Sequence, residues 1–178
     1  MWQKILSYGL VAGLIVAIPM NLMMIFMKGH PPLAWAMAFG YVTMLVALSA
    51  VFVAIKRYRD TELGGVIRFW PALGLGLGIS VVAGIIYMFA WELSLAITHI
   101  DFGAAYADTL IAEKKAAGVS GDALAELTAE MNAFKIEYAN PLYRMPMTFA
   151  EIFPVGVLVS LVSAALLRNS RFLAARRA

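Results

Sequence analysis

The chain has 178 residues, of which 62% are hydrophobic and 14% are charged, so it carries more apolar surface than a soluble domain of this size can bury. The lack of cysteine excludes disulfides, thiol nucleophiles and zinc–thiolate sites. The formal charge of +3 comes from cations at predicted helix ends rather than from one basic patch, so we expect the lipid bilayer, and no nucleic acid, as a partner.

Four apolar runs are each near or above the roughly 20 residues that a membrane-spanning helix needs. They cover about residues 5–27, 35–55, 69–97 and 147–167. Because unpaired backbone groups cannot face hydrocarbon, we predict an all-α membrane protein with one domain over residues 1–178, built as a bundle of four transmembrane helices. The first run is too long for the apolar core of a signal peptide, so we expect it to be retained.

The short connectors set the expected orientation in the membrane. The first two runs are separated by two consecutive prolines, which predict a tight turn. Residues 56–68 carry four cations, and lysine and arginine in short loops remain on the cytoplasmic side. Counting by sides gives nine Lys and Arg on the side of this connector and five on the other, so both termini are predicted to be cytoplasmic. An aromatic belt agrees, with Trp2 and Trp70 at the cytoplasmic ends and Trp35 and Trp91 at the outer ends.

The segment between the third and fourth runs is different, with seven acids against four bases. We predict an outer helical hairpin over about residues 101–140, made of amphipathic helices at 104–117 and 122–139. The second helix has an apolar stripe of Leu124, Leu127, Met131, Phe134 and Tyr138. This stripe rests either on lipid headgroups or on the outer mouth of the bundle. The net negative charge favours a lid on the mouth, and whether helix three continues into the hairpin stays open.

Small residues recur every four positions in three of the predicted spans, a spacing that lets helix backbones approach closely. They are Gly9, Gly13, Ala17, Gly74, Gly78, Ser80, Gly84, Gly156, Ser160 and Ala164. Packing within one chain is the favoured interpretation, and a homo-oligomer seam is the alternative.

Three polar side chains within the spans are predicted to share one depth near the outer interface. They are Asn21, Glu92 and Glu151, with Pro19 and Pro154 within one turn of them, and His30, His99, Asp101 and Arg144 form the expected rim. Intramembrane polar groups are candidates for function. Structural anchoring is favoured here, because a carboxylate at the interface reaches water or pairs with a nearby cation. A cation or proton site is the alternative, and a metal site at His30, His99 and Asp101 has no known zinc spacing.

The sequence lacks the residue patterns of common catalytic sites. No serine stands beside a histidine base, and no pair of aspartates lies within the predicted membrane core. We therefore expect no catalytic, cofactor-binding or metal-binding residues, and no enzymatic activity.

Two motifs resemble those of a bacterial family of small four-helix membrane proteins known as a domain of unknown function. The first is IKRYRDTELGGVIRF at residues 55–69, and the second is MTFAEIFPVG at residues 147–156. The cytoplasmic motif residues are Lys56, Arg57, Arg59, Asp60, Glu62, Gly64 and Gly65. The resemblance covers nearly the whole chain and implies a bacterial inner-membrane location. It implies no activity or substrate.

The leading functional hypothesis is a non-enzymatic envelope scaffold or regulator that acts on a protein partner through the outer hairpin. The alternative is a small oligomeric transporter or channel for protons, cations or a small solute, which would use Glu151 and Glu92. A minor third hypothesis is lipid binding in a groove beside Pro154.

Overall fold

The computed structural model describes residues 1–26 and 33–174, and within them the fold is all α. Its helices are α1 (Trp2–Phe26), α2 (Leu33–Glu62), α3 (Phe69–Thr98), α4 (Phe102–Ala116), α5 (Gly121–Tyr138) and α6 (Pro141–Leu167). The predicted all-α class is confirmed. The tight turn expected at residues 28–32, and His30 with it, lie outside the described residues.

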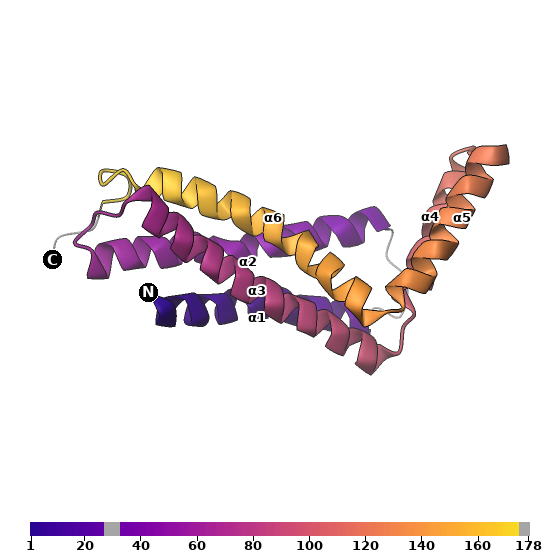
Figure 1. Ribbon diagram of the computed structural model, residues 1–178, viewed down its shortest axis with the longest axis horizontal. Helices are drawn as coiled ribbons and strands as arrows, with labels where there is room; N and C mark the ends of the chain where they lie inside the picture. Colours follow the sequence, from indigo (N-terminus) through magenta and orange to yellow (C-terminus); the bar gives the residue numbers. More distant parts are fainter. Residues whose placement is uncertain (27–32, 175–178) are drawn as a thin grey trace.

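Four of these helices, α1, α2, α3 and α6, are long and apolar enough to cross a membrane. They lie side by side, and the N-terminus, the α2–α3 turn and the C-terminal end of α6 gather at one end of the bundle (Figure 1). We call this the basic end. The helices α4 and α5 project from the opposite end, which we call the hairpin end (Figure 1).

Helix α3 lies at the centre of the bundle and packs against both α1 and α6. Its residues Leu75 and Ile79 are completely buried, and they share the core with Leu48 and Val51 of α2 and with Ile152 of α6. The outward faces of the same helices carry exposed large apolar side chains, as helices surrounded by lipid do. The apolar pattern thus buries one stripe of each span in protein and leaves the rest for a bilayer.

Glycine allows these close contacts. A Cβ atom at Gly9 would stand 2.5 Å from Val82 Cβ, and one at Gly156 would stand 2.6 Å from Ser80 Cβ, both too close to be accommodated. The predicted packing of small residues within the chain is therefore confirmed at these positions. The expectation was wrong for Gly74, where an added Cβ would meet no atom within 4 Å. Gly76 contacts α6 instead, with Ser160 as its neighbour.

The α2–α3 turn depends on two consecutive glycines. Gly64 and Gly65 have φ angles of 62° and 89°, values that strain any residue with a side chain. In this conformation the N–H of Gly65 donates to the carbonyl oxygen of Arg59 at 2.9 Å and closes the end of α2. The glycines of the first sequence motif thus permit a reversal of direction within a few residues.

Helix α3 ends before the hairpin, which answers the question left open by the sequence. His99 adopts a left-handed conformation with φ 52°, and Asp101 caps α4 by accepting a hydrogen bond from the N–H of Ala104 at 2.9 Å. At the other side of the hairpin, Asn140 caps α6 and Pro141 occupies its first turn. Helix α6 therefore begins six residues before the predicted boundary at Met147.

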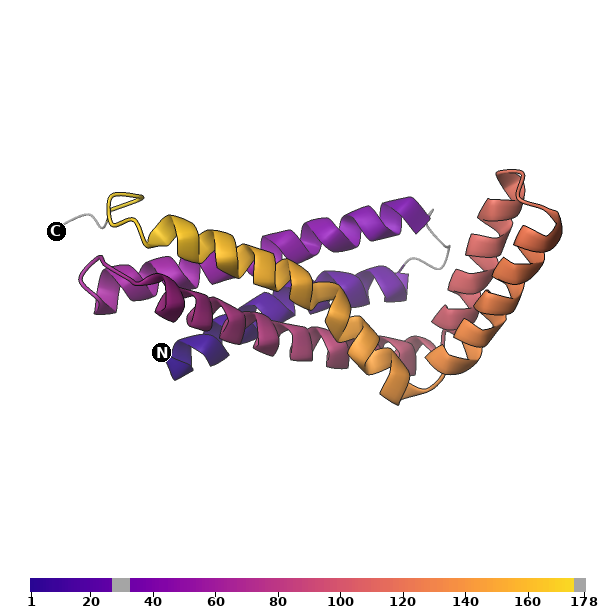
Figure 2. The ribbon, with the colours of Figure 1, turned by 45° about the horizontal axis from the view of Figure 1, so that its top comes forward.

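The hairpin differs from the predicted lid in how its apolar stripe is covered. The stripe of α5 packs against α4, with the rings of Phe134 and Tyr106 centred 5.7 Å apart. The hairpin leans away from the axis of α6 and joins the bundle at its base (Figure 2). The two helices thus cover most of each other's apolar faces, and the stripe meets the bundle only at its base, where Tyr138 contacts Trp91 of α3.

Candidate functional site

The predicted polar residues all bind to one short stretch of α3. Asn21 of α1, Arg144 of α6 and Glu151 of α6 each have a hydrogen-bond partner between residues 87 and 94, a stretch that rises about 10 Å along the helix. They belong to two different helices and have different partners, so they form separate contacts at similar depth.

Glu92 is neutralised by a paired arginine. Arg144 Nε donates to Glu92 Oε1 at 2.7 Å, and Arg144 Nη2 donates to Glu92 Oε2 at 2.5 Å, the bidentate geometry that suits a guanidinium and a carboxylate. Arg144 Nη1 also donates to the carbonyl oxygen of Tyr138 at 3.0 Å. This arginine, predicted only as a rim residue, therefore joins α3, α5 and α6.

An aromatic cluster lies beside this ion pair. Trp91 packs edge-on against Phe102 with ring centroids 4.9 Å apart, and its Nε1–H donates to the Tyr138 hydroxyl at 2.9 Å. Burial raises the pKa of Tyr138 to about 12, so this hydroxyl is neutral at physiological pH. Trp91 is 9% exposed, so it anchors the hairpin and does not belong to a lipid-facing aromatic belt.

Asn21 fastens α1 to α3. Its Oδ1 accepts a hydrogen bond from Ser94 Oγ at 2.7 Å, and its Nδ2 donates to the carbonyl oxygen of Ala17 at 3.0 Å. Asn21 is one of the residues that line an apolar surface groove between the two helices, together with Ile18 and Phe89. The amide is thus fully engaged within the chain, which fits a structural role.

Glu151 has fewer and longer hydrogen bonds than Glu92. Its Oε2 accepts one hydrogen bond, from the Tyr87 hydroxyl at 3.4 Å, and no lysine or arginine among residues 1–26 and 33–174 pairs with it. Glu92 and Glu151 therefore differ in chemistry, although the sequence alone treated them alike.

The remaining predicted site residues have local roles. Pro19 lies inside α1 and Pro154 inside α6, and α6 bends along its length (Figure 2), as proline within a helix produces. His99 and Asp101 form the link between α3 and α4. In the described part of the chain, no three histidine, aspartate or glutamate side chains are placed to hold a metal ion.

The basic end contains a buried arginine whose role the sequence did not reveal. Arg59 is completely buried, and its guanidinium donates to the carbonyl oxygens of Phe172 at 2.9 Å and Leu173 at 2.7 Å. Its Nε–H donates to Asp60 Oδ1 at 2.7 Å, and a longer contact of 3.4 Å reaches the carbonyl oxygen of Leu167. We call these five residues the Arg59 cluster.

Other residues of the first sequence motif join neighbouring helices at the same end. Lys56 pairs with Asp60 at 2.6 Å, and Lys4 of α1 pairs with Glu62 of α2 at 2.9 Å. Arg57 donates to the Tyr8 hydroxyl at 3.3 Å. A motif interpreted from the sequence as a topology signal thus also connects α1, α2 and the segment after α6.

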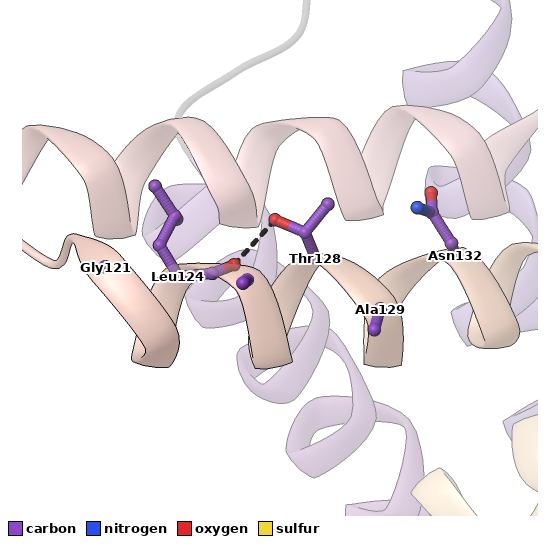
Figure 3. Close-up of a pocket in the computed structure, with 6 residues that line it drawn as sticks. Gly121, Leu124, Thr128, Ala129 and Asn132 are labelled. Carbon is purple, nitrogen blue, oxygen red and sulfur yellow. Dashed lines mark hydrogen bonds between the residues drawn. The ribbon is translucent and has the colours of Figure 1, made fainter.

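A shallow groove follows α5 on the hairpin itself. It is lined by Gly121, Leu124, Ala125, Thr128, Ala129 and Asn132. Leu124, Thr128 and Asn132 point toward the neighbouring helix (Figure 3). Within α5, Thr128 Oγ1 donates a hydrogen bond to the carbonyl oxygen of Leu124. This surface is open, and no ionisable group lines it.

Sequence reasoning missed two of the α3 side chains that make these contacts, Tyr87 and Ser94, and assigned Trp91 to an aromatic belt instead. Tyr87, Trp91 and Ser94 lie at spacings of four and three, so they share one face of α3, and all three are buried. Polar-tipped residues repeated on one face of an apolar helix were the available signal. They mark the face where α3 meets its polar partners.

The fold and these contacts define an all-α chain with four membrane-span-like helices and a projecting helical hairpin. The chain belongs to the family described as Protein of unknown function (DUF4199), which matches residues 7–169. The match includes both sequence motifs and the hairpin. Comparison with curated proteins and with solved structures found no match.

Proposed function

We propose that this protein is a non-enzymatic scaffold of the bacterial inner membrane, in which the four-helix bundle holds the α4–α5 hairpin outside the cytoplasm to contact another envelope protein. The observation that carries the proposal is the attachment at the hairpin base. The Arg144–Glu92 pair and the Trp91–Tyr138 hydrogen bond fix α5 to α3 and α6. A surface held in one orientation binds a partner with less entropic cost than a mobile loop.

The surface chemistry of the hairpin supports a protein partner. The groove on α5 presents alanine and glycine, which allow another helix to approach closely. Exposed acids flank it at Asp122, Glu126 and Glu130. We therefore expect a partner segment that is helical and carries basic residues beside small or apolar ones.

Site-specific crosslinking in cells tests the proposal. A photocrosslinking residue at Ala125 or Ala129, both exposed, is expected to capture one discrete protein. The same residue at Leu158, which is 62% exposed on the outward face of α6, is the matched control and is expected to capture lipid. Recovery of lipid or a second copy alone from Ala125 and Ala129 would contradict the scaffold function.

Proton or cation transport is the second candidate, and the environment of Glu151 favours it. This carboxylate lies on a candidate span with Tyr87 as its hydrogen-bond partner, and charged groups in such positions commonly mark ion pathways. Protein reconstituted in liposomes would give a gradient-dependent flux that Glu151→Gln abolishes. Glu113→Gln, at an exposed position on α4, is the control, and equal flux in both variants would remove Glu151 from any pathway.

A further inference from the structure

The junction of α5 and α6 presents an apolar patch that is unusually open. Leu142 is 80% exposed and Ile136 is 77% exposed, the two largest fractions among the big apolar side chains of residues 1–25 and 38–174. Tyr143 beside them is 42% exposed. We call Ile136, Leu142 and Tyr143 the elbow patch.

The backbone of the junction fixes the direction in which this patch points. Ile136 precedes the buried Tyr138 by two residues, and Leu142 precedes Arg144 by two residues. Two residues correspond to about 200° around a helix, so each exposed side chain points away from the one that anchors the hairpin to α3. Asn140 caps the start of α6 through its hydrogen bond to the N–H of Leu142 at 3.0 Å, which holds the two helices in this arrangement.

The length of α6 places the elbow patch at the depth of lipid headgroups. Leu142 and Arg168 are separated by roughly 39 Å of helix. A bilayer including both headgroup regions is about 40–45 Å thick. With Arg168 at one surface, Leu142 lies within the opposite headgroup layer, and bending or tilt of α6 brings it closer to the hydrocarbon.

We propose that the elbow patch inserts into the interfacial layer of the membrane that the bundle spans, and thereby fixes the hairpin against the bilayer. The patch continues the apolar outward surface of the candidate span, since Met147 follows it on α6 and is 40% exposed. Tyr143 supplies the amphipathic ring that is favoured at this depth. The inference goes beyond the scaffold function, because it requires only that α6 crosses the bilayer.

The proposal also accounts for the hairpin's orientation. Apolar side chains at an interface are buried about 5–10 Å into the boundary between headgroups and acyl chains. Contacts with α3 hold one side of the α5–α6 junction, and lipid contacts at Ile136 and Leu142 hold the other. Rotation of the hairpin about its base would move Ile136 away from the bilayer or break the hydrogen bonds that Tyr138 makes with Trp91 and Arg144.

Depth measurements on single-cysteine variants test the inference, and the lack of native cysteine makes them direct. Ile136→Cys and Leu142→Cys carry an environment-sensitive fluorophore in vesicles of phosphatidylethanolamine and phosphatidylglycerol. Ala129→Cys on the hairpin is the aqueous control, and Leu158→Cys on the outward face of α6 is the lipid control. Circular dichroism of each labelled protein confirms that its helix content is unchanged.

The expected result is blue-shifted emission at both elbow positions, with several-fold stronger quenching by a lipid that carries a nitroxide near its headgroup than at Ala129. Quenching by aqueous iodide equal to that at Ala129 would overturn the proposal. Labels shielded from both quenchers would overturn it as well, because that outcome identifies a protein contact, such as a second copy, on the patch.

Discussion

The guanidinium of Arg59 donates to the carbonyl oxygen of Leu173 at 2.7 Å, and so joins the end of α2 to the backbone beyond α6. A completely buried cation is costly unless its donors are satisfied, and here Asp60 and three carbonyl oxygens accept from it. The segment that follows α6, as far as Leu173, is therefore part of the folded bundle, and Arg59 helps to hold it there.

Arg59→Ala is expected to lower the free energy of unfolding by about 2–4 kcal/mol, because it leaves several buried carbonyl oxygens without their donor and removes one of the two cations that pair with Asp60. Denaturant unfolding in detergent micelles measures this loss. Limited trypsin digestion measures the local effect, and we expect faster cleavage after Arg168 and Arg171. Arg57→Ala is the control, since its side chain is exposed and has one contact with Tyr8. Equal stability and equal cleavage in the two variants would contradict the role of the Arg59 cluster.

Truncating either partner of the Arg144–Glu92 pair should weaken the attachment of the hairpin. The side chains of Arg144 and Glu92 are 12% and 21% exposed. A double-mutant cycle on the free energy of unfolding, with Arg144→Ala and Glu92→Gln, is therefore expected to give a coupling energy of about 1–2 kcal/mol. The Lys135–Asp108 pair is the control, because it lies on the more exposed surface of the hairpin and should give about 0–1 kcal/mol. A coupling at Arg144 no larger than at Lys135 would argue against a role in attachment.

Replacing Gly9 by alanine should separate α1 from α3. Its new Cβ would stand 2.5 Å from Val82 Cβ, so we expect a loss of about 1–3 kcal/mol through overpacking. Gly74→Ala is the matched control, since a Cβ there meets open space and alanine favours a helix. Thermal unfolding of both variants in the same detergent compares them. A stability ranking in the reverse order would show that this α1–α3 contact does not form.

The Tyr138 hydroxyl should ionise late in an alkaline titration. Its pKa is raised to about 12 by burial, so the folded state favours the neutral form. The stabilisation is fully present below the unfolded pKa of about 10 and is lost as the pH rises through about 12. The difference in tyrosinate absorbance between the wild type and Tyr138→Phe should therefore have its midpoint near 12. A midpoint near 10 would mean that water reaches the base of the hairpin.

Cysteine accessibility in intact cells tests the predicted orientation. Thr61→Cys at the basic end should be protected from an impermeant thiol reagent until the cells are permeabilised. Ala129→Cys on the hairpin should react at once. Both positions are exposed, so different reactivity reports the side of the membrane. Labelling of Thr61→Cys from outside intact cells would show that the topology is the reverse of the predicted one.

Much of the architecture follows from patterns that are visible in the sequence. The apolar runs predicted the spans because the bilayer sets a minimum helix length, and the expected start of the third span at Phe69 is observed. The start of the fourth span was misplaced by six residues. The misplacement arose because Arg144 and Pro146 resemble loop residues. In the structure Arg144 lies within α6 and pairs with Glu92 of α3, and Pro146 is tolerated near the start of a helix.

The site was less predictable, since depth along a helix can be counted but direction around it depends on tertiary contacts. Counting residues brought Asn21, Glu92 and Glu151 near one level. It did not reveal that Glu92 faces Arg144 while Glu151 faces Tyr87. The burial of Arg59 was also inaccessible, because its acceptors are backbone carbonyls about 110 residues later, and backbone groups leave no trace in side-chain composition.

The distance in sequence between Arg59 and its acceptors also sets an order for biosynthesis. Helix α2 leaves the ribosome about 110 residues before the carbonyl oxygens of Phe172 and Leu173 are synthesised, so its arginine is at first without these acceptors. During translation this guanidinium must stay hydrated or bind lipid phosphate at the membrane surface. Folding of the basic end is therefore completed only after the residues that follow α6 have been synthesised and their carbonyl oxygens replace water around Arg59.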